Sequence, residues 1–153
     1  MTLPTGEHVP RTFTFVTDTA TMCVFDVACL RHRLDDTADW WSIPADELAE
    51  VNAGHAGFFN LGSDGAYAVE LCDDLPDPQA SVHLRVPSGR VFLGAAEEVT
   101  ADGLEPEAAF GGAFLQLAPG NYRVLARRDD ARIALAVLPG GEGANAFAEL
   151  VRI

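Results

Sequence analysis

Hydrophobic and polar residues alternate along several short stretches of the chain, and this period of two predicts β-strands. The clearest case is 115–125, where two alternating runs flank a Pro-Gly-Asn turn at 119–121. Turn residues between two alternating runs are typical of a β-hairpin. We therefore expect a hairpin at 115–125, with Leu117 and Val124 in the core.

The same alternation predicts strands along most of the chain. The expected strands are 12–17, 21–27, 56–61, 66–72, 81–86, 90–94, 122–128, 132–138 and 146–153. Short turns join the first six of these in successive pairs, which predicts three more hairpins. The strand at 132–138 extends the hairpin at 115–125 into a meander, and 28–34 fits either a strand or a short helical turn.

One stretch, 35–54, interrupts the strand pattern. Pro44 and the two acidic residues that follow Ala45 favour the start of a helix, and a glycine at the end of the stretch favours its stop. We expect one short helix at 45–52, with Leu48 and Val51 facing the core because they are three positions apart.

The spacing of these elements indicates the fold class. Turn signals recur at roughly 8 to 12 residues, which is typical of an antiparallel sandwich or barrel. We predict an all-β fold, an antiparallel β-sandwich or partly open barrel of about 8–10 strands with one short helix. No repeat or linker divides the 153 residues, so residues 1–153 are expected to form a single β domain with 1–11 loosely ordered.

The charge distribution narrows the range of partners. The chain has a formal net charge of −13, and all ten of its basic residues are arginine. Nucleic acid is an improbable partner, because phosphate contacts need a basic patch. Solubility, a GC-rich genome or adaptation to high salt would each explain the acidity. An acidic face that meets a basic protein partner would explain it as well.

Other features of the sequence indicate a cytoplasmic protein from a bacterium. The sequence contains no apolar run of the roughly 18 residues that a membrane helix needs, and its N-terminus lacks the pattern of a secretory signal. Three cysteines, Cys23, Cys29 and Cys72, form no CxxC pair. We interpret them as reduced and mostly buried thiols.

Searches for catalytic and metal-binding motifs favour a protein without catalytic activity. No GxSxG elbow or P-loop is present, and paired carboxylates carry little information in a chain with 23 acidic residues. The histidines fall in four different predicted elements without ligand spacing; they are His8, His32, His55 and His83. We expect no metal and no cofactor, although folding could still bring distant ligands together.

The most unusual motif is a pair of adjacent tryptophans next to acidic residues. Neighbouring side chains diverge in both strands and helices, so at least one ring is expected at a rim, under a loop or on the surface. Tryptophan is a frequent energetic anchor of protein interfaces. The candidate partner-binding residues are Asp35, Asp36, Asp39, Trp40, Trp41, Asp73 and Asp74. Alternatively, one ring closes an end of the sandwich while the other covers the helix.

Two functional hypotheses follow. The first is a noncatalytic, acidic, cytoplasmic binding protein that recognises a basic protein partner, such as a toxin or nuclease that it inhibits in the manner of an immunity protein. The alternative is a small-molecule-binding or enzymatic β-barrel that the stretch 35–54 closes as a lid. A subunit of a larger assembly is a third possibility, because sandwiches have exposed strand edges, and the oligomeric state stays open.

Overall fold

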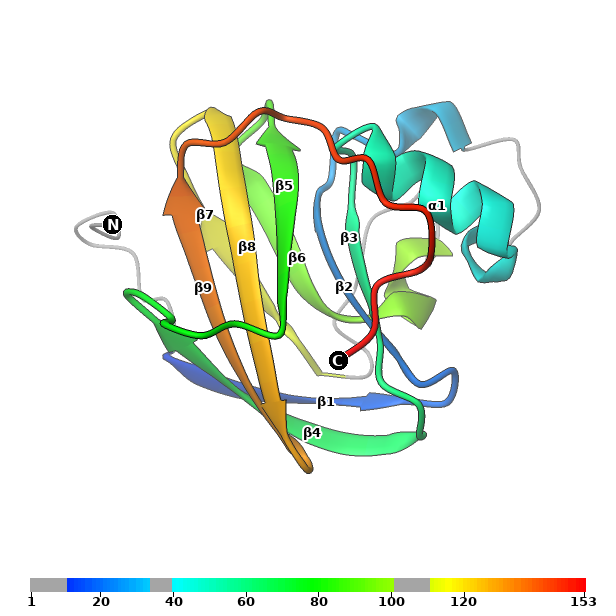
Figure 1. The fold of residues 1–153 in the computed structure, drawn as a ribbon, viewed down its shortest axis with the longest axis vertical. Coiled ribbons are helices and arrows are strands. Elements are labelled where there is room, and N and C mark those ends of the chain that lie inside the picture. Colours follow the sequence, from blue (N-terminus) through cyan, green and yellow to red (C-terminus); the bar gives the residue numbers. More distant parts are fainter. Residues whose placement is uncertain (1–10, 34–39, 101–110) are drawn as a thin grey trace.

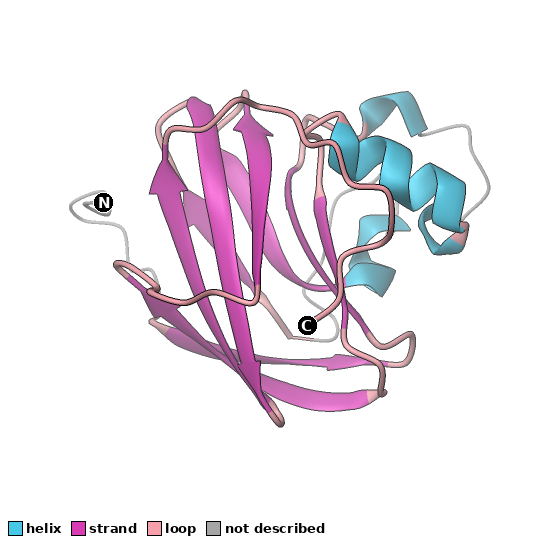
Figure 2. Cartoon of the chain, in the orientation of Figure 1, coloured by secondary structure: helices cyan, strands magenta, loops and turns pink. Residues whose placement is uncertain are grey.

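Two β-sheets lie face to face in the computed structural model, which describes residues 11–33, 40–100 and 111–153 (Figure 1). One sheet has five strands in the order β1-β4-β9-β8-β5, and the other has four in the order β3-β2-β6-β7. Strands and loops make up most of the chain, and the helices gather at one side of the sandwich (Figure 2). The predicted all-β sandwich with one short α-helix is therefore confirmed.

The elements follow one another along the chain in this order. They are β1 (Thr12–Thr17), β2 (Thr21–Asp26), η1 (Arg31–Arg33), η2 (Trp40–Ser42), α1 (Pro44–Asn52), β3 (Gly57–Asn60), β4 (Gly65–Cys72), β5 (Ala80–Val86), β6 (Arg90–Ala95), η3 (Ala96–Thr100), β7 (Ala113–Gln116), β8 (Gly120–Asp129) and β9 (Arg132–Pro139). Among the described residues, no helix combines the length and the apolar character that crossing a membrane requires.

The predicted hairpins are mostly wrong. Strands β1 and β2 lie in different sheets, as do β3 and β4, β5 and β6, and β7 and β8. The turn at 119–121 therefore carries the chain from one sheet to the other, although Leu117 and Val124 are buried as expected. Strands β8 and β9 do form a hairpin. Alternation and a turn predict two strands with buried faces, but they do not distinguish a return within one sheet from a crossing to the opposite sheet.

Two further expectations need correction. Strand β4 pairs with β9 in parallel, so the sandwich is not purely antiparallel. The stretch 146–153 is not a strand, and its one ladder contact is a bridge between Asn60 and Arg152. The chain that follows β9 runs over the ends of β8 and β5 and then past α1 (Figure 1). The side chain of Asn145 bonds the backbone N–H and C=O of His83 on edge strand β5.

Large side chains fill the space between the sheets. The buried aromatic residues of this core include Phe15, Phe25, Phe58, Phe59 and Phe92. Helix α1 begins at Pro44, as its first-turn signals predicted, and buries Val51. Leu48 was expected in the core but is only half-buried, whereas Glu47 and Glu50 are buried. Burying two carboxylates requires polar partners, and these partners define the site described next.

Candidate functional site

A buried carboxylate, Glu50 of α1, lies at the centre of a polar cluster beside the sandwich. Its Oε2 atom is 2.7 Å from Nε2 of His32 and accepts a hydrogen bond of 2.8 Å from Nε of Arg33. Its Oε1 atom is 2.7 Å from Nδ1 of His55. The two imidazole rings also face each other, with 5.2 Å between their centroids. Three side chains thus converge on one carboxylate.

The fold brings these residues together from both sides of the stretch 35–54. His32 and Arg33 belong to η1, before this stretch, whereas His55 follows the helix directly. The turn after α1 passes through Gly54 in the left-handed region, at φ 78°, which glycine adopts without strain. The backbone N–H of His55 then donates to the carbonyl oxygen of Glu50 at 3.0 Å. The cluster therefore ties the helix to the segments that enter and leave it.

The electrostatics of the cluster favour an ionised Glu50. Burial by itself raises the pKa of a carboxyl group, but the hydrogen bonds from His55, His32 and Arg33 outweigh it and lower the pKa of Glu50 below its usual value. Arg33 also pairs with Asp46 at 3.4 Å and stacks 4.6 Å from the ring of Trp40. The guanidinium is thereby held by two carboxylates and one aromatic ring.

A surface hollow of about 440 Å³ adjoins the cluster at His55. Its lining residues are Ala28, Cys29, His55, Arg85, Val86, Pro87, Pro119, Gly120 and Asn121. Burial raises the pKa of the Cys29 thiol to about 12, and the nearby carboxylate of Asp26 adds to this effect. Cys29 therefore stays protonated near neutral pH, and a nucleophilic role for this thiol has no support.

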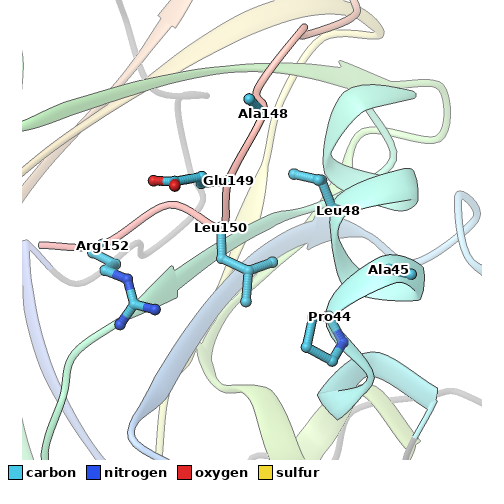
Figure 3. Close-up of a pocket in the computed structure, with 7 residues that line it drawn as sticks. All are labelled: Pro44, Ala45, Leu48, Ala148, Glu149, Leu150 and Arg152. Atoms are coloured by element: carbon cyan, nitrogen blue, oxygen red, sulfur yellow. The ribbon is translucent and has the colours of Figure 1, made fainter.

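A second hollow, of about 360 Å³, lies between α1 and the C-terminal segment (Figure 3). Its lining residues are Pro44, Ala45, Leu48, Ala148, Glu149, Leu150 and Arg152. Leu48 of the helix and Leu150 of the C-terminal segment face the space between these two elements (Figure 3). Beside it, at the start of the helix, Ile43 is 44% exposed. We call this apolar surface the α1 hollow.

Comparison with known proteins identifies a family. Residues 9–153 match the model of a family described as "Family of unknown function (DUF6386)". The chain belongs to this family. No curated protein matches it significantly. A solved structure titled "Crocagin biosynthetic gene J" is similar at 17% sequence identity and a TM-score of 0.55, covering 86% of this chain and 97% of that one. A likeness at this identity shows a shared fold.

The structure separates the candidate residues that the sequence singled out. Asp35, Asp36 and Asp39 lie outside the described residues. Trp40 and Trp41 are only 1% and 5% exposed. Their ring centroids lie 6.3 and 6.5 Å from that of Phe58, so neither ring is an exposed anchor in this structure.

The last two candidate residues lie elsewhere, on the exposed loop that follows β4. Asp73 forms an ion pair of 3.0 Å with Arg11, and Asp74 accepts a hydrogen bond from the backbone N–H of Leu75. Burial of the tryptophans and this separation leave the partner-binding role of the whole set a prediction.

Sequence reasoning missed the cluster around Glu50. His32 and His55 are 23 positions apart and belong to different elements, so no motif spacing connects them. The spacing of hydrophobic residues placed Leu48 and Val51 on the inward face of the helix and assigned no position to Glu50. A carboxylate at an inward position of the helix, with a histidine five residues further on, is the signal that the sequence did contain.

Replacing Glu47 by glutamine is expected to raise the melting temperature near pH 7 by a few degrees. Burial raises the pKa of Glu47 above its unfolded value, so stability falls as the pH rises through these two pKa values. Glutamine removes the charge and keeps an oxygen for Asn60, whose side chain donates to Glu47 at 3.0 Å. Calorimetry should show that the gain disappears near pH 3, where the carboxyl group is protonated in both states. The exposed Glu149→Gln is the control, and an equal gain there would contradict the argument.

Proposed function

We propose that this chain is a noncatalytic binding protein, which recognises a basic protein partner through the α1 hollow. The observation that carries the proposal is the half-buried apolar pair of Leu48 and Leu150 in this hollow, which Glu149 and Arg152 flank. Ile43, exposed at the start of the helix, adds apolar surface next to Pro44. An apolar centre with a polar rim is the usual anatomy of a protein interface. Ile43 and Leu48 would be its anchors in place of the tryptophans.

Charge supports a basic partner. Several arginines bind groups of the chain itself: Arg11 with Asp73, Arg33 with Glu50, Arg85 with the carbonyl of Gly143, Arg127 with that of Pro76 and Arg128 with that of Leu61. With a net charge of −13, the remaining surface is strongly acidic. Such a field accelerates encounter with a basic protein and disfavours acidic ones. A basic toxin or nuclease, inhibited in the cytoplasm, fits this description.

The packing of the sandwich supports recognition at its surface. Buried side chains of both sheets belong to one hydrophobic core. Within the four-stranded sheet, Phe25 and Phe92 meet edge to face with 6.2 Å between centroids. The interior of the sandwich is thus occupied, whereas a ligand-binding barrel encloses a cavity. The Glu50 cluster also fixes α1 before a partner arrives, which reduces the entropy lost on binding.

The test compares two variants that each add one positive charge. Leu48→Arg places it in the α1 hollow, and Ala68→Arg places it at an exposed position of β4 on the outer face of the five-stranded sheet. Immobilised protein should retain a basic protein from a lysate of the source cells, and salt should elute it. We expect the wild type and Ala68→Arg to retain it and Leu48→Arg to lose it. Equal retention by both variants, with equal melting temperatures, would overturn the proposal.

The hollow beside His55 favours one second candidate, a small-molecule-binding protein. Arg85 lines this hollow together with His55 and Asn121, and a guanidinium with an imidazole beside it suits an anionic ligand. Screening small carboxylates and phosphates by thermal shift tests this candidate. A ligand that stabilises the wild type but not Arg85→Gln would support it, and the absence of any stabilising ligand would count against it.

A further inference from the structure

We propose that His32, Glu50 and His55 form a binding site for one divalent transition-metal ion, for which Zn²⁺ is the best match. The ligand atoms that these three residues offer all lie within 4.8 Å of one another. Two imidazole nitrogens and one carboxylate oxygen are a common donor set for Zn²⁺, completed by a water molecule in the fourth position. The proposal is independent of partner recognition at the α1 hollow.

The separations of the ligand atoms are close to those that a tetrahedral ion needs. With metal–ligand bonds of about 2.1 Å, neighbouring ligand atoms of a tetrahedral site lie about 3.4 Å apart. Nδ1 of His55 is 2.7 Å from Oε1 of Glu50, so widening this separation by roughly 0.7 Å admits an ion between them. Nε2 of His32, which contacts Oε2, lies within 4.8 Å of the other ligand atoms and completes the set. The side chains of His32 and His55 are 48% and 31% exposed, which leaves both rings room to move.

A neighbouring residue already orients the carboxylate of Glu50, as outer-shell residues orient the ligands of a metal ion. Arg33 donates to Oε2 at 2.8 Å, so this oxygen stays occupied while Oε1 faces His55 and is available to the ion. Outer-shell partners of this kind orient a ligand and tune its affinity. The positive charge of Arg33 opposes a cation, but Asp46 offsets part of it at 3.4 Å. We therefore expect affinity of roughly micromolar strength rather than that of a closed structural zinc site.

When no ion is bound, hydrogen atoms lie between the two imidazole nitrogens and the oxygens of Glu50. Each imidazole then shares a hydrogen with a Glu50 oxygen, which accounts for the two contacts of 2.7 Å. Because a coordinated nitrogen carries no proton, the ion displaces these hydrogens. The partial exposure of both rings gives the ion, and a water molecule as its fourth ligand, a path from solvent.

The experiment titrates untagged full-length protein with ZnCl₂ by calorimetry and with CoCl₂ by visible absorption. We expect one ion to bind per chain. The visible absorption spectrum of bound Co²⁺ should be that of an ion with nitrogen and oxygen ligands. His32→Gln and His55→Gln should each weaken Zn²⁺ binding by about 100-fold. The matched control is His83→Gln on β5, whose ring accepts a hydrogen bond from the backbone N–H of Glu142. This variant should bind like the wild type.

Melting curves distinguish loss of the site from loss of the fold. Zn²⁺ should raise the melting temperature of the wild type and of His83→Gln, because an ion that binds the folded state stabilises it. It should leave the folded His32→Gln variant unchanged, and this histidine is exposed enough to be replaced without unfolding. Binding that is equal in His32→Gln, His55→Gln and His83→Gln, or the absence of binding by the wild type, would overturn the proposal.

Discussion

Replacing Glu50 by alanine is expected to lower the free energy of unfolding by roughly 3 kcal/mol. Arg33, whose side chain is only 15% exposed, then keeps its charge but loses its main acceptor. His32 and His55 also lose the carboxylate oxygens to which they are hydrogen-bonded. Asp46, at 3.4 Å, compensates only part of the hydration that this mostly buried cation has lost, so removal of Glu50 is costly.

Urea unfolding of metal-free protein measures this effect. Glu50→Gln keeps the size and one acceptor oxygen of the side chain, so we expect it to lie between Glu50→Ala and the wild type. An exposed carboxylate near the same helix, Glu149→Ala, should change stability by less than about 0.5 kcal/mol. If Glu50→Ala were as mild as Glu149→Ala, the cluster would not hold α1 in place.

Replacing Asp26 by alanine is expected to cost roughly 4 kcal/mol, the largest stability change that we predict. Asp26 ends β2 with no exposed surface. Its two oxygens accept hydrogen bonds from the backbone of Ala28, from both the backbone and the hydroxyl of Ser88, and from the backbone of Gly89, at 2.7 to 3.0 Å. Alanine removes the acceptor of all four hydrogen bonds, including that of the buried Gly89 N–H, and the turn between β5 and β6 loses its anchor.

The matched control for Asp26 is Asp64→Ala, a carboxylate in the exposed turn between β3 and β4. It should change the free energy of unfolding by less than about 0.5 kcal/mol. Asp26→Asn should be intermediate, because asparagine retains an acceptor oxygen for part of the network. Chemical denaturation gives all three values, and a loss below about 1 kcal/mol for Asp26→Ala would show that water replaces the carboxylate.

Strand positions were largely predictable, because the burial of one strand face requires a period of two in the sequence. The predicted strand at 12–17 has the bounds of β1, and that at 132–138 differs from β9 by one residue. The helix at 45–52 was predicted one residue short of α1. These are local properties, since turn residues and capping preferences act on neighbours in the chain.

Strand pairing was not predictable, because it depends on contacts between distant residues. Strand β4 lies between β1 and β9, and nothing near Gly65 in the sequence specifies either neighbour. The C-terminal segment at 146–153 has a similar explanation. Its hydrophobic residues alternate because the segment packs over strand ends, and not because it forms a strand. At one such end, the carbonyl oxygen of Val151 accepts a hydrogen bond from the backbone N–H of Asn60.

The sequence by itself determined an acidic, all-β chain of about 8–10 short strands with one helix near Pro44, because net charge and the alternation of hydrophobic residues are properties of the sequence. Only the tertiary structure decided that Trp40 and Trp41 are buried and that Leu48 is not. It alone also gathered His32 and His55 around Glu50. The physical reason is that a site combines residues from elements that pack together, and packing is set by the whole core rather than by any local pattern.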